Sequence, residues 1–391
     1  MRLADRVGHF TESVIREMTR LAARHGAINL GQGMPDFSAP QAVKEAACRA
    51  IQDDYNQYAI TWGAPALREA IAKKVAEFNG LPCDPDRNVT VCCGATECMM
   101  ATMLALVNPG DEVVIFQPFY ENYGPDAIIS GAKPVWVPLR PPHWTFDPDE
   151  LRRAFSDRSK AIILNTPNNP TGHVFTRNEL SLVAELCQKH DAYALADEIY
   201  EYIIHTDQPH VSIAALPGML DRTVTISGLS KTFSVTGWRL GYCIAPSDVS
   251  NAIRKAHDFL TVGAPHPLQM AGVAALNLPA EYYAKLKADY TRRRDLFLPY
   301  LRDAGLTVYE PEGAYYVMTD VSPLGWSDDT AFVRAMIEQV GVSAVPGSSF
   351  YAPKELGRTM VRFMFAKKDE TLRAAGERLR GLREMKMIGA A

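Results

Sequence analysis

Residues 223–245 read TVTISGLSKTFSVTGWRLGYCIA and place one lysine between two apolar segments. Thr223–Ile226 and Tyr242–Ala245 are short and apolar, which is typical of buried strands. Lys231 follows the first segment among small and hydroxylated residues. A lysine desolvated at a strand end has a lowered pKa, and its free amine can form a Schiff base with a carbonyl. Taken alone, Lys231 is better interpreted as an exposed loop lysine, so the surrounding motifs decide.

Further apolar segments precede this stretch, and helical patterns separate them. The predicted strands are Val89–Val91, Glu112–Phe116, Pro134–Val137, Ala161–Leu164 and Tyr193–Ala196. The predicted helices are Thr96–Leu106, Glu179–His190 and Asn251–Leu260. Strands that alternate with helices predict an α/β protein, with three α/β/α layers around a mostly parallel sheet.

The pattern changes near residue 280, which indicates a second, smaller α+β domain. Long charged helices are predicted at Glu281–Ala304 and Asp328–Val340, with short strands at Tyr315–Met318 and Met360–Phe365. Near the N-terminus, Thr11–His25 has a helical pattern. The 391 residues exceed a typical single domain. We expect residues 1–45 to form an N-terminal arm and part of the small domain, 46–280 the large domain, and 281–391 the remaining small domain.

Composition favours a small-molecule enzyme. Hydrophobic residues make up 47% and charged residues 22% of the chain, and the formal net charge is −4. Arg292–Arg294 is the longest basic run, so we expect no nucleic-acid partner. The chain lacks both an apolar run long enough for a membrane span and a signal peptide over Met1–Phe10. We therefore expect a cytoplasmic protein with no membrane partner.

The seven cysteines form no CxxC pair. Cys92, Cys93 and Cys98 are close in sequence, but no second group of His or Cys residues at a matching spacing accompanies them. We interpret the cysteines as buried thiols in a reducing compartment and predict no metal site.

Three other motifs follow predicted strands. Asp197 ends the strand at Tyr193–Ala196, where a carboxylate could pair with a protonated ring nitrogen, although it could equally cap a helix. Asn169 lies in a turn-forming loop, residues 165–172, and offers both a donor and an acceptor. Gly94 opens a helix, and the free N–H groups there suit a phosphate, which is a weak signal by itself.

Together and in this order, these motifs resemble the fold-type I aminotransferases of class I/II, which depend on pyridoxal 5′-phosphate (PLP). The resemblance covers nearly the whole chain. Its most specific parts are NNPTG at 168–172, ADEIY at 196–200, and the segment from Ser230-Lys231 to GWRLG at 237–241. The sequences GQGMPDF at 31–37 and NQY at 56–58 look like the kynurenine, glutamine and methionine aminotransferase subgroup.

The resemblance implies a role for each matching residue. Lys231 would hold PLP as a Schiff base and then act as the base at the substrate's α-carbon. Asp197 would pair with the ring nitrogen, while Tyr200 and Asn169 would hydrogen-bond the ring oxygen. The remaining cofactor residues would be Tyr120, stacked on the ring, and the phosphate ligands Gly94, Ala95, Thr96 and Arg239.

The resemblance also implies substrate contacts and an oligomer. Arg362, in Val361-Arg362-Phe363, would grip the α-carboxylate, for which its planar fork is suited. Gly33 would let the backbone approach the substrate. Tyr58 would reach the phosphate of a neighbouring subunit, which implies a homodimer. The substrates would be amino acids and 2-oxo acids, in amino-acid metabolism or biosynthesis.

One position departs from the family pattern. Many relatives have a phosphate-binding serine three residues before the lysine, where this chain has Gly228. Ser227 or Ser230 could replace that contact, and the sequence does not decide between them.

Three other functions share some of these features. A carbon–sulfur β-lyase shares the fold and the first chemical step. A PLP-binding regulator would usually carry a basic DNA-binding domain, which this chain lacks. A nicotinamide dehydrogenase is disfavoured because Gly31-Gln32-Gly33 lacks a third glycine and a preceding strand. Tyr58, Trp62 and Tyr123 could line an aromatic pocket, but aromatic residues at such spacing are more often part of the core.

Overall fold

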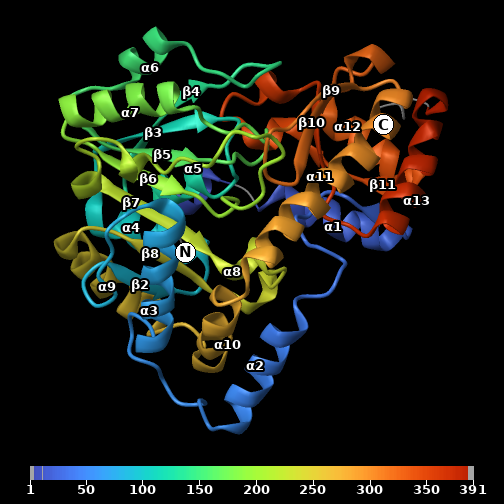
Figure 1. Ribbon diagram of the computed structural model, residues 1–391. Helices are drawn as coiled ribbons and strands as arrows, with labels where there is room; N and C mark the ends of the chain where they lie inside the picture. Colours follow the sequence, from blue (N-terminus) through green and yellow to red (C-terminus); the bar gives the residue numbers. More distant parts are fainter. Residues whose placement is uncertain (1–3, 11, 386–391) are drawn as a thin grey trace.

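A computed structural model describes residues 4–10 and 12–385, and a seven-stranded sheet lies at its centre (Figure 1). The strand order is β2-β8-β7-β6-β5-β3-β4. All strands run parallel except β8, which is antiparallel to both of its neighbours. The chain reverses direction between β7 and β8 because their connection is short and carries only small helical turns. The predicted mostly parallel sheet is confirmed.

Alternate residues of the central strands point to opposite faces, and helices cover both faces. In β5, Ile162 and Leu164 pack with α6 and α7, whereas Ala161 and Ile163 pack with α4, α5 and α9. Successive strand side chains point to opposite sides, so a strand buried on both faces needs apolar residues throughout. This explains the uninterrupted apolar segments and confirms the three α/β/α layers.

The strand ends are aligned, and the alignment determines where the site forms. Asn165 in β5 is paired with Asp197 in β6, which is paired with Ile226 in β7. In β7, Gly228 is paired with Gly241 in β8, which is paired with Cys92 in β2. The loops after β2, β5, β6 and β7 therefore leave the sheet at the same edge.

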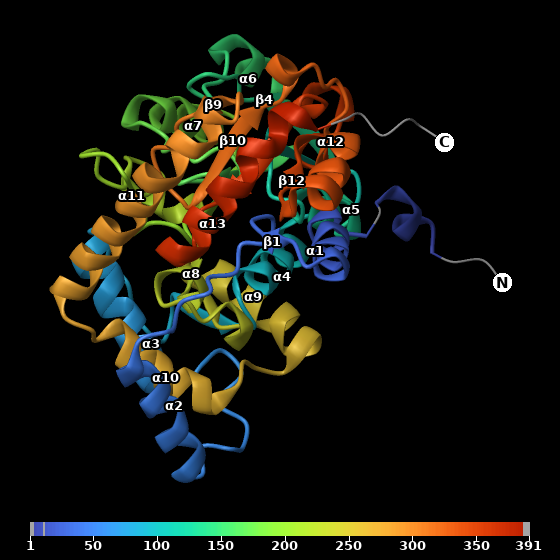
Figure 2. The ribbon, with the colours of Figure 1, turned by 90° about the vertical axis from the view of Figure 1, so that its right-hand side faces the viewer.

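The C-terminal part contains a second sheet of antiparallel strands, in the order β12-β13-β10-β9. The helices α11, α12 and α13 share its hydrophobic core. The N-terminal strand β1 pairs with β11, so residues near 28 lie beside residues near 342. Figure 2 shows α2 next to α10, below the rest of the chain. The domain boundaries at residues 45 and 280 stay predictions.

The strands have the following bounds: β1 Ile28–Asn29, β2 Val89–Cys92, β3 Glu112–Gln117, β4 Lys133–Pro138, β5 Ser159–Asn165, β6 Tyr193–Asp197, β7 Thr223–Gly228, β8 Gly241–Ile244, β9 Thr307–Tyr309, β10 Tyr316–Asp320, β11 Val342–Ser343, β12 Val345–Pro346 and β13 Met360–Met364. The α-helices are α1 Val14–His25, α2 Gln41–Gln52, α3 Pro65–Lys74, α4 Ala95–Leu106, α5 Tyr123–Ile129, α6 Pro148–Ala154, α7 Arg177–Lys189, α8 Leu229–Thr232, α9 Ser247–Thr261, α10 His266–Leu276, α11 Ala280–Asp303, α12 Asp329–Ala335 and α13 Asp369–Leu379.

The predicted elements differ from these bounds by a few residues at their ends. Helix α1 begins at Val14 because the Ser13 side chain caps it, and Thr11 lies outside the described residues. The helix predicted over Asp328–Val340 is α12, capped by Asp328, which continues as a π-helical turn, η7 (Met336–Val340). A similar π-helical turn, η2 (Val75–Asn79), continues α3.

Candidate active site

Asp197 ends β6 with its side chain buried at the edge where the loops converge. The Tyr123 hydroxyl donates to Asp197 Oδ2 at 2.7 Å, and the Ile199 backbone N–H donates to Oδ1 at 3.2 Å. Burial nevertheless raises the pKa of Asp197 to about 6, against the effect of these bonds and of Lys231. A cationic group beside Asp197 would restore the charged form.

Lys231 lies in α8, the short helix that follows β7. Its Nζ atom is 5.9 Å from the ring centre of Tyr200 and 5.8 Å from that of Tyr315. Burial lowers the pKa of Lys231, and the nearby charges of Arg239 and Arg362 lower it further, while Tyr316 and Asp197 act in the opposite direction. The desolvation expected from the sequence is thus present at this lysine.

Arg362 lies in the middle of β13 and is 1% exposed. It donates from Nη1 to Asn169 Oδ1 at 2.7 Å and from Nη2 to the Gly31 carbonyl at 2.6 Å. Its guanidinium carbon is 4.2 Å from the ring centre of Tyr316, and its Nε has no hydrogen-bond partner among the described residues. The structure therefore joins three segments that are far apart in sequence around one cation with unused donor capacity.

Gly33 lies against two tyrosines that the sequence analysis did not select. The Tyr315 hydroxyl donates to the Gly33 carbonyl at 3.1 Å, and a Cβ built on Gly33 would lie 2.1 Å from the Tyr316 hydroxyl. The Tyr316 and Tyr200 hydroxyls are 3.1 Å apart. No motif marks Tyr315 and Tyr316 in the sequence, because their importance comes from where β10 places them.

The loop between β2 and α4 forms a cradle with the segment that leads into β8. Gly94 has φ +87°, and a Cβ on it would lie 2.5 Å from Arg239 Nη2. A Cβ on Gly241 would lie 2.4 Å from the Ala95 nitrogen. The first turn of α4, with Ala95 and Thr96, has N–H groups free of helical partners, and the helix dipole favours an anion there. Arg239 adds a cation, so the donor set fits a phosphate.

The structure distinguishes the two serines near Gly228. A Cβ on Gly228 would lie 2.9 Å from both the Gly241 Cα and the Leu240 carbonyl oxygen, so a serine side chain would be crowded there. Ser227 donates to Glu201 Oε1 at 2.8 Å. The Ser227 hydroxyl is therefore occupied by Glu201. Ser230 is the better candidate for the phosphate contact that Gly228 lacks.

The other aromatic candidates lie in different surroundings. Tyr120 packs edge-on against Tyr123 with 5.7 Å between ring centres, and burial raises the pKa of Tyr120 to about 12. Trp62 stacks under Arg254, at 5.2 Å from the guanidinium carbon to the ring centre. Tyr58 is 84% exposed. The Tyr123 hydroxyl binds Asp197. The three aromatic residues Tyr58, Trp62 and Tyr123 therefore lie in three different environments.

A second group of ionisable residues, here called the paired cluster, lies beside the site and consists of Lys74, Glu198, Glu201 and His210. Lys74 Nζ is 2.6 Å from Glu201 Oε2, and His210 Nε2 is 2.8 Å from Glu198 Oε2. Their side chains are at most 6% exposed. Although Glu198, Glu201 and His210 are close enough to bind a cation, the Lys74 ammonium already fills that role.

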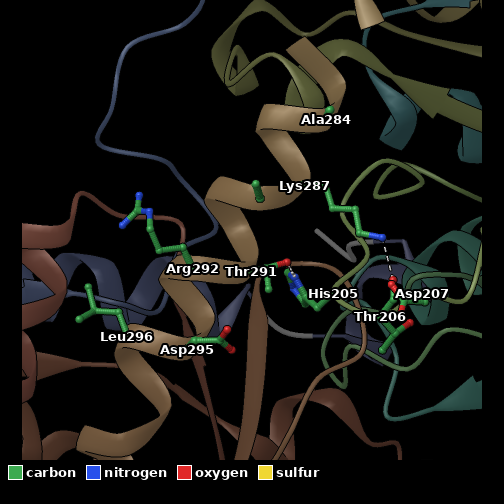
Figure 3. A pocket seen from close by; sticks show the side chains of 10 residues that line it. His205, Thr206, Asp207, Ala284, Lys287, Thr291, Arg292, Asp295 and Leu296 are labelled. Carbon is green, nitrogen blue, oxygen red and sulfur yellow. Dashed lines mark hydrogen bonds between the residues drawn. The ribbon is translucent and has the colours of Figure 1, made fainter. Parts of the chain in front are cut away.

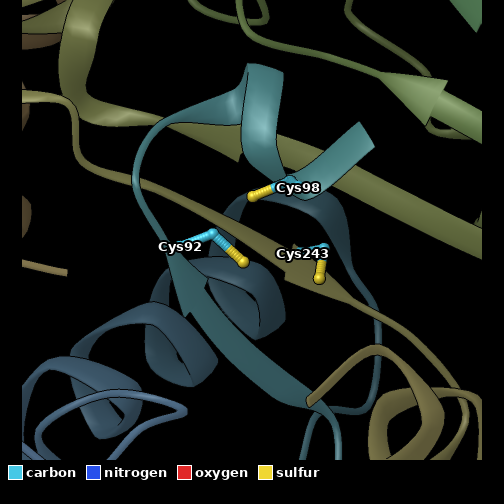
Figure 4. Close-up of side chains that lie close together, drawn as sticks. All are labelled: Cys92, Cys98 and Cys243. Carbon is cyan, nitrogen blue, oxygen red and sulfur yellow. The ribbon is translucent and has the colours of Figure 1, made fainter. Parts of the chain in front are cut away.

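Three cysteine sulfurs gather in the core beneath the cradle (Figure 4). Cys92 on β2 and Cys243 on β8 are diagonal neighbours, and Cys98 comes from α4. All three are at most 1% exposed and pack with apolar residues. We interpret them as core thiols, as expected from the sequence, and the predicted absence of a metal site stays a prediction.

A surface hollow lies between α11 and residues 205–207, apart from this convergence of loops (Figure 3). His205 donates from Nε2 to the Ala314 carbonyl at 2.8 Å, and its Nδ1 lies 3.2 Å from the Thr291 hydroxyl. Lys287 donates to the Thr206 carbonyl at 2.8 Å. These contacts attach α11 to the segment after β6. In the described ranges, we find no helix with the length and apolar content needed to cross a membrane.

The α/β/α layers, the partly buried lysine and the buried carboxylate at one sheet edge, and the phosphate cradle define a PLP-dependent enzyme of fold type I. Residues 25–379 match the family described as aminotransferase class I and II. The chain belongs to this family, so transamination with PLP as the cofactor is its chemistry.

Similar proteins agree with this membership. The chain is 38% identical over 370 residues to methionine aminotransferase of Escherichia coli (strain K12), covering 95% of this chain and 96% of the relative. It is 39% identical over 412 residues to kynurenine–oxoglutarate transaminase 3 of Mus musculus, covering 98% and 90%. The solved structure of N-succinyldiaminopimelate aminotransferase from Mycobacterium tuberculosis has a TM-score of 0.95 at 38% identity, covering 97% of this chain and all of that one.

Proposed function

We propose that the residues that meet at this sheet edge have separate roles in transamination, the transfer of an amino group from an L-amino acid to a 2-oxo acid. The observation that carries this proposal is the buried Arg362 fork, held by Asn169 and Gly31 at 2.7 and 2.6 Å beside Lys231. A planar guanidinium binds both oxygens of a carboxylate, so Arg362 orients the α-carboxylate and thereby the α-carbon.

The residues present fit PLP. Its phosphate would meet the N–H groups of Gly94, Ala95 and Thr96 with Arg239, and Ser230 would supply the hydroxyl that Gly228 lacks. Tyr120 would stack on its ring, and Tyr200 and Asn169 would bind its ring oxygen. When bound, PLP supplies an electron-withdrawing ring that stabilises negative charge at the substrate's α-carbon.

The proton chemistry belongs to Lys231 and Asp197. Lys231 attaches the cofactor and, once released, takes the proton from the α-carbon, for which its lowered pKa suits it. Asp197 holds the proton on the ring nitrogen. The Tyr123 hydroxyl, at 2.7 Å from Asp197 Oδ2, fixes the direction of that carboxylate. This hydrogen bond supports a role for Tyr123 beside Asp197 rather than in a substrate pocket.

We also propose a homodimer. Apolar side chains are exposed where residues 51–60 meet the end of α9, and the most exposed are Tyr58 at 84% and Phe259 at 92%. Hydrogen bonds from Thr61 to Asp258, and between His266 and the Gln57 carbonyl, join these segments into one surface. Exposed apolar surfaces of this kind mark interfaces. A second subunit here would cover Phe259 and receive Tyr58 at its phosphate.

Mixed dimers test the role of Tyr58. Neither Tyr58→Ala nor Lys231→Ala protein should be active alone. After subunit exchange, we expect about a quarter of the wild-type activity. Half of the dimers then contain one subunit of each variant, and one of the two sites in each such dimer is intact. If Tyr58 serves its own subunit, the mixture stays inactive.

A donor panel tests the reaction and its substrates. Methionine, kynurenine and glutamine, each with a fixed 2-oxo acid, would be compared for steady turnover. Dependence on the 2-oxo acid supports transamination. Release of pyruvate, ammonia and thiol from a sulfur amino acid without the 2-oxo acid would instead support a β-lyase. The seven free cysteines favour a reducing, cytoplasmic location, which we propose on that basis.

A further inference from the structure

Tyr316 occupies the centre of the site. It begins β10, is 3% exposed, and lies between the cofactor side and the substrate side. Its hydroxyl is 3.1 Å from that of Tyr200, and its ring lies under the Arg362 guanidinium at 4.2 Å. One side chain thus contacts the phenol expected at the cofactor ring and the cation expected at the carboxylate.

The charges that face Tyr316 come from several elements. Burial opposes its ionisation, but the Lys231 ammonium and the Arg362 guanidinium outweigh burial and lower the pKa of Tyr316, with help from the hydroxyls of Tyr200 and Tyr315. A phenol with a lowered pKa is a stronger hydrogen-bond donor. Tyr200, in contrast, has a pKa raised well above the ordinary value by burial.

We propose that Tyr316 is a positioning residue that couples Tyr200 to Arg362, an inference that rests on the proposed roles of those two residues. Its hydroxyl donates to Tyr200, and its ring supports the Arg362 guanidinium.

The direction of the hydrogen bond follows from counting protons. A phenol has one hydrogen to donate, so a Tyr200 that donates to the cofactor's ring oxygen must accept from Tyr316. Accepting this bond makes Tyr200 a stronger donor in turn, since linked hydrogen bonds polarise one another. The same geometry explains Gly33, because any side chain there would collide with the Tyr316 hydroxyl.

Two substitutions separate the hydroxyl from the ring. Tyr316→Phe keeps the ring under Arg362 and removes the donor to Tyr200. Tyr316→Leu removes both. The matched control is Tyr290→Phe, because Tyr290 is buried, stacks on Tyr315 at 5.6 Å, and has a hydroxyl without a hydrogen-bond partner in the described part of the chain.

The first readout is the pH midpoint at which the absorbance of the Lys231-bound cofactor changes. A donated hydrogen bond stabilises the ring oxygen most when the neighbouring nitrogen has lost its proton, so a weaker donor raises the midpoint. For Tyr316→Phe we expect an increase of about 0.4–1 unit, the equivalent of one neutral hydrogen bond. The KM for amino acids should change less than about twofold, because the ring remains.

Tyr316→Leu should raise the midpoint by a similar amount. It should also increase the KM for every amino acid about twofold to thirtyfold, the range for a lost cation–π contact. A second readout uses cofactor-free protein, in which the absorbance of ionised tyrosine is titrated. The component that ionises at the lowest pH should disappear in Tyr316→Phe and persist in Tyr290→Phe.

An unchanged midpoint and an unchanged tyrosine titration in Tyr316→Phe would overturn the proposal. An equal change in the Tyr290→Phe control would overturn it as well, because the effect would then be unspecific. Borohydride labelling of the same samples keeps the proposed function separate. Label at Lys231 with no Tyr316 effect defeats only this inference, whereas label at another lysine defeats the proposed function itself.

Discussion

Residues 197–201 contribute to two groups of ionisable side chains, and only one of these groups contains ion pairs. Glu198 and Glu201 belong to the paired cluster, in which Lys74 and His210 lie 2.6 and 2.8 Å from their partners. Asp197 belongs to the site cluster, defined here as Asp197, Lys231 and Arg362 with Tyr200 and Tyr316. Within the described residues, no ion pair includes Asp197, Lys231 or Arg362 within 4.0 Å.

The difference separates structural from functional charges. In the paired cluster Lys74 and His210 outweigh burial and lower the pKa of Glu201, so its charge is stabilised by the fold. In the site cluster burial raises the pKa of Asp197 and lowers that of Lys231, which disfavours both charges. Ionisable groups left without an oppositely charged partner in this way indicate that a ligand is needed to complete the site.

The largest effect is expected for Lys231→Ala, which should abolish turnover because the attachment point and the proton-transfer base are lost together. Borohydride reduction of the wild type should fix PLP on the peptide that contains Lys231. Lys287→Ala serves as the control and should stay active, because Lys287 lies on α11 and donates to the Thr206 carbonyl. Label on any other lysine would contradict the assignment.

Asp197→Asn should slow the deprotonation step by two to four powers of ten, about 3–6 kcal/mol at about 1.4 kcal/mol per tenfold. Asparagine keeps the shape: its oxygen can still accept from the Ile199 N–H, while its amide nitrogen would donate to the Tyr123 hydroxyl. It removes the charge that holds the ring proton. PLP should still bind. Single-turnover rates measure the effect, and near-normal turnover in folded protein would leave Asp197 only a capping role.

Glu201→Gln, in contrast to Asp197→Asn, should lower stability and leave turnover nearly unchanged. Removing one partner of a buried ion pair leaves Lys74 uncompensated and should lower the free energy of unfolding by about 3–5 kcal/mol. Turnover per folded molecule should remain near that of the wild type. Chemical denaturation and active-site titration on one sample measure the two quantities. A large loss of turnover without a loss of stability would erase the distinction between the clusters.

The stability of cofactor-free protein should depend on pH through Asp197. Its pKa rises from 3.8 to about 6 on folding, so the folded state holds the proton more tightly than the unfolded state. The stability from this carboxyl group is present below pH about 4 and is lost as pH rises through about 6, a change of about 3 kcal/mol at about 1.4 kcal/mol per unit. Cofactor-free Asp197→Asn should therefore be more stable than the wild type at pH 7, and the two should converge near pH 4.

Arg362→Lys should weaken the binding of every amino acid by about 1.5–3 kcal/mol, because lysine keeps the charge but lacks the planar fork. The bonds to Asn169 and Gly31 would also be reduced to one donor group. Affinities for amino acids and for amines without the carboxylate should be compared. Equal losses for both would mean that Arg362 does not bind the carboxylate.

The sequence predicted the central sheet well because its strands are apolar on both faces and lie close to recognisable motifs. Lys231, Asp197 and Asn169 follow strands, so their meeting at one sheet edge could be anticipated. Tyr123, Tyr315 and Tyr316 could not be assigned in the same way. Their roles depend on contacts with residues up to 282 positions away, such as Tyr315 with Gly33.

The sequence by itself determined the α/β/α architecture, the family, and the lysine, carboxylate and arginine that we propose for the chemistry, because short-range patterns and strand-end motifs encode them. Only the tertiary structure decided which charges remain unpaired, why Gly228 excludes a side chain while Ser227 binds Glu201, and that Tyr316 joins Tyr200 to Arg362. The physical reason is that pairing, crowding and burial depend on distances between segments, and those distances are set when strands and helices pack together.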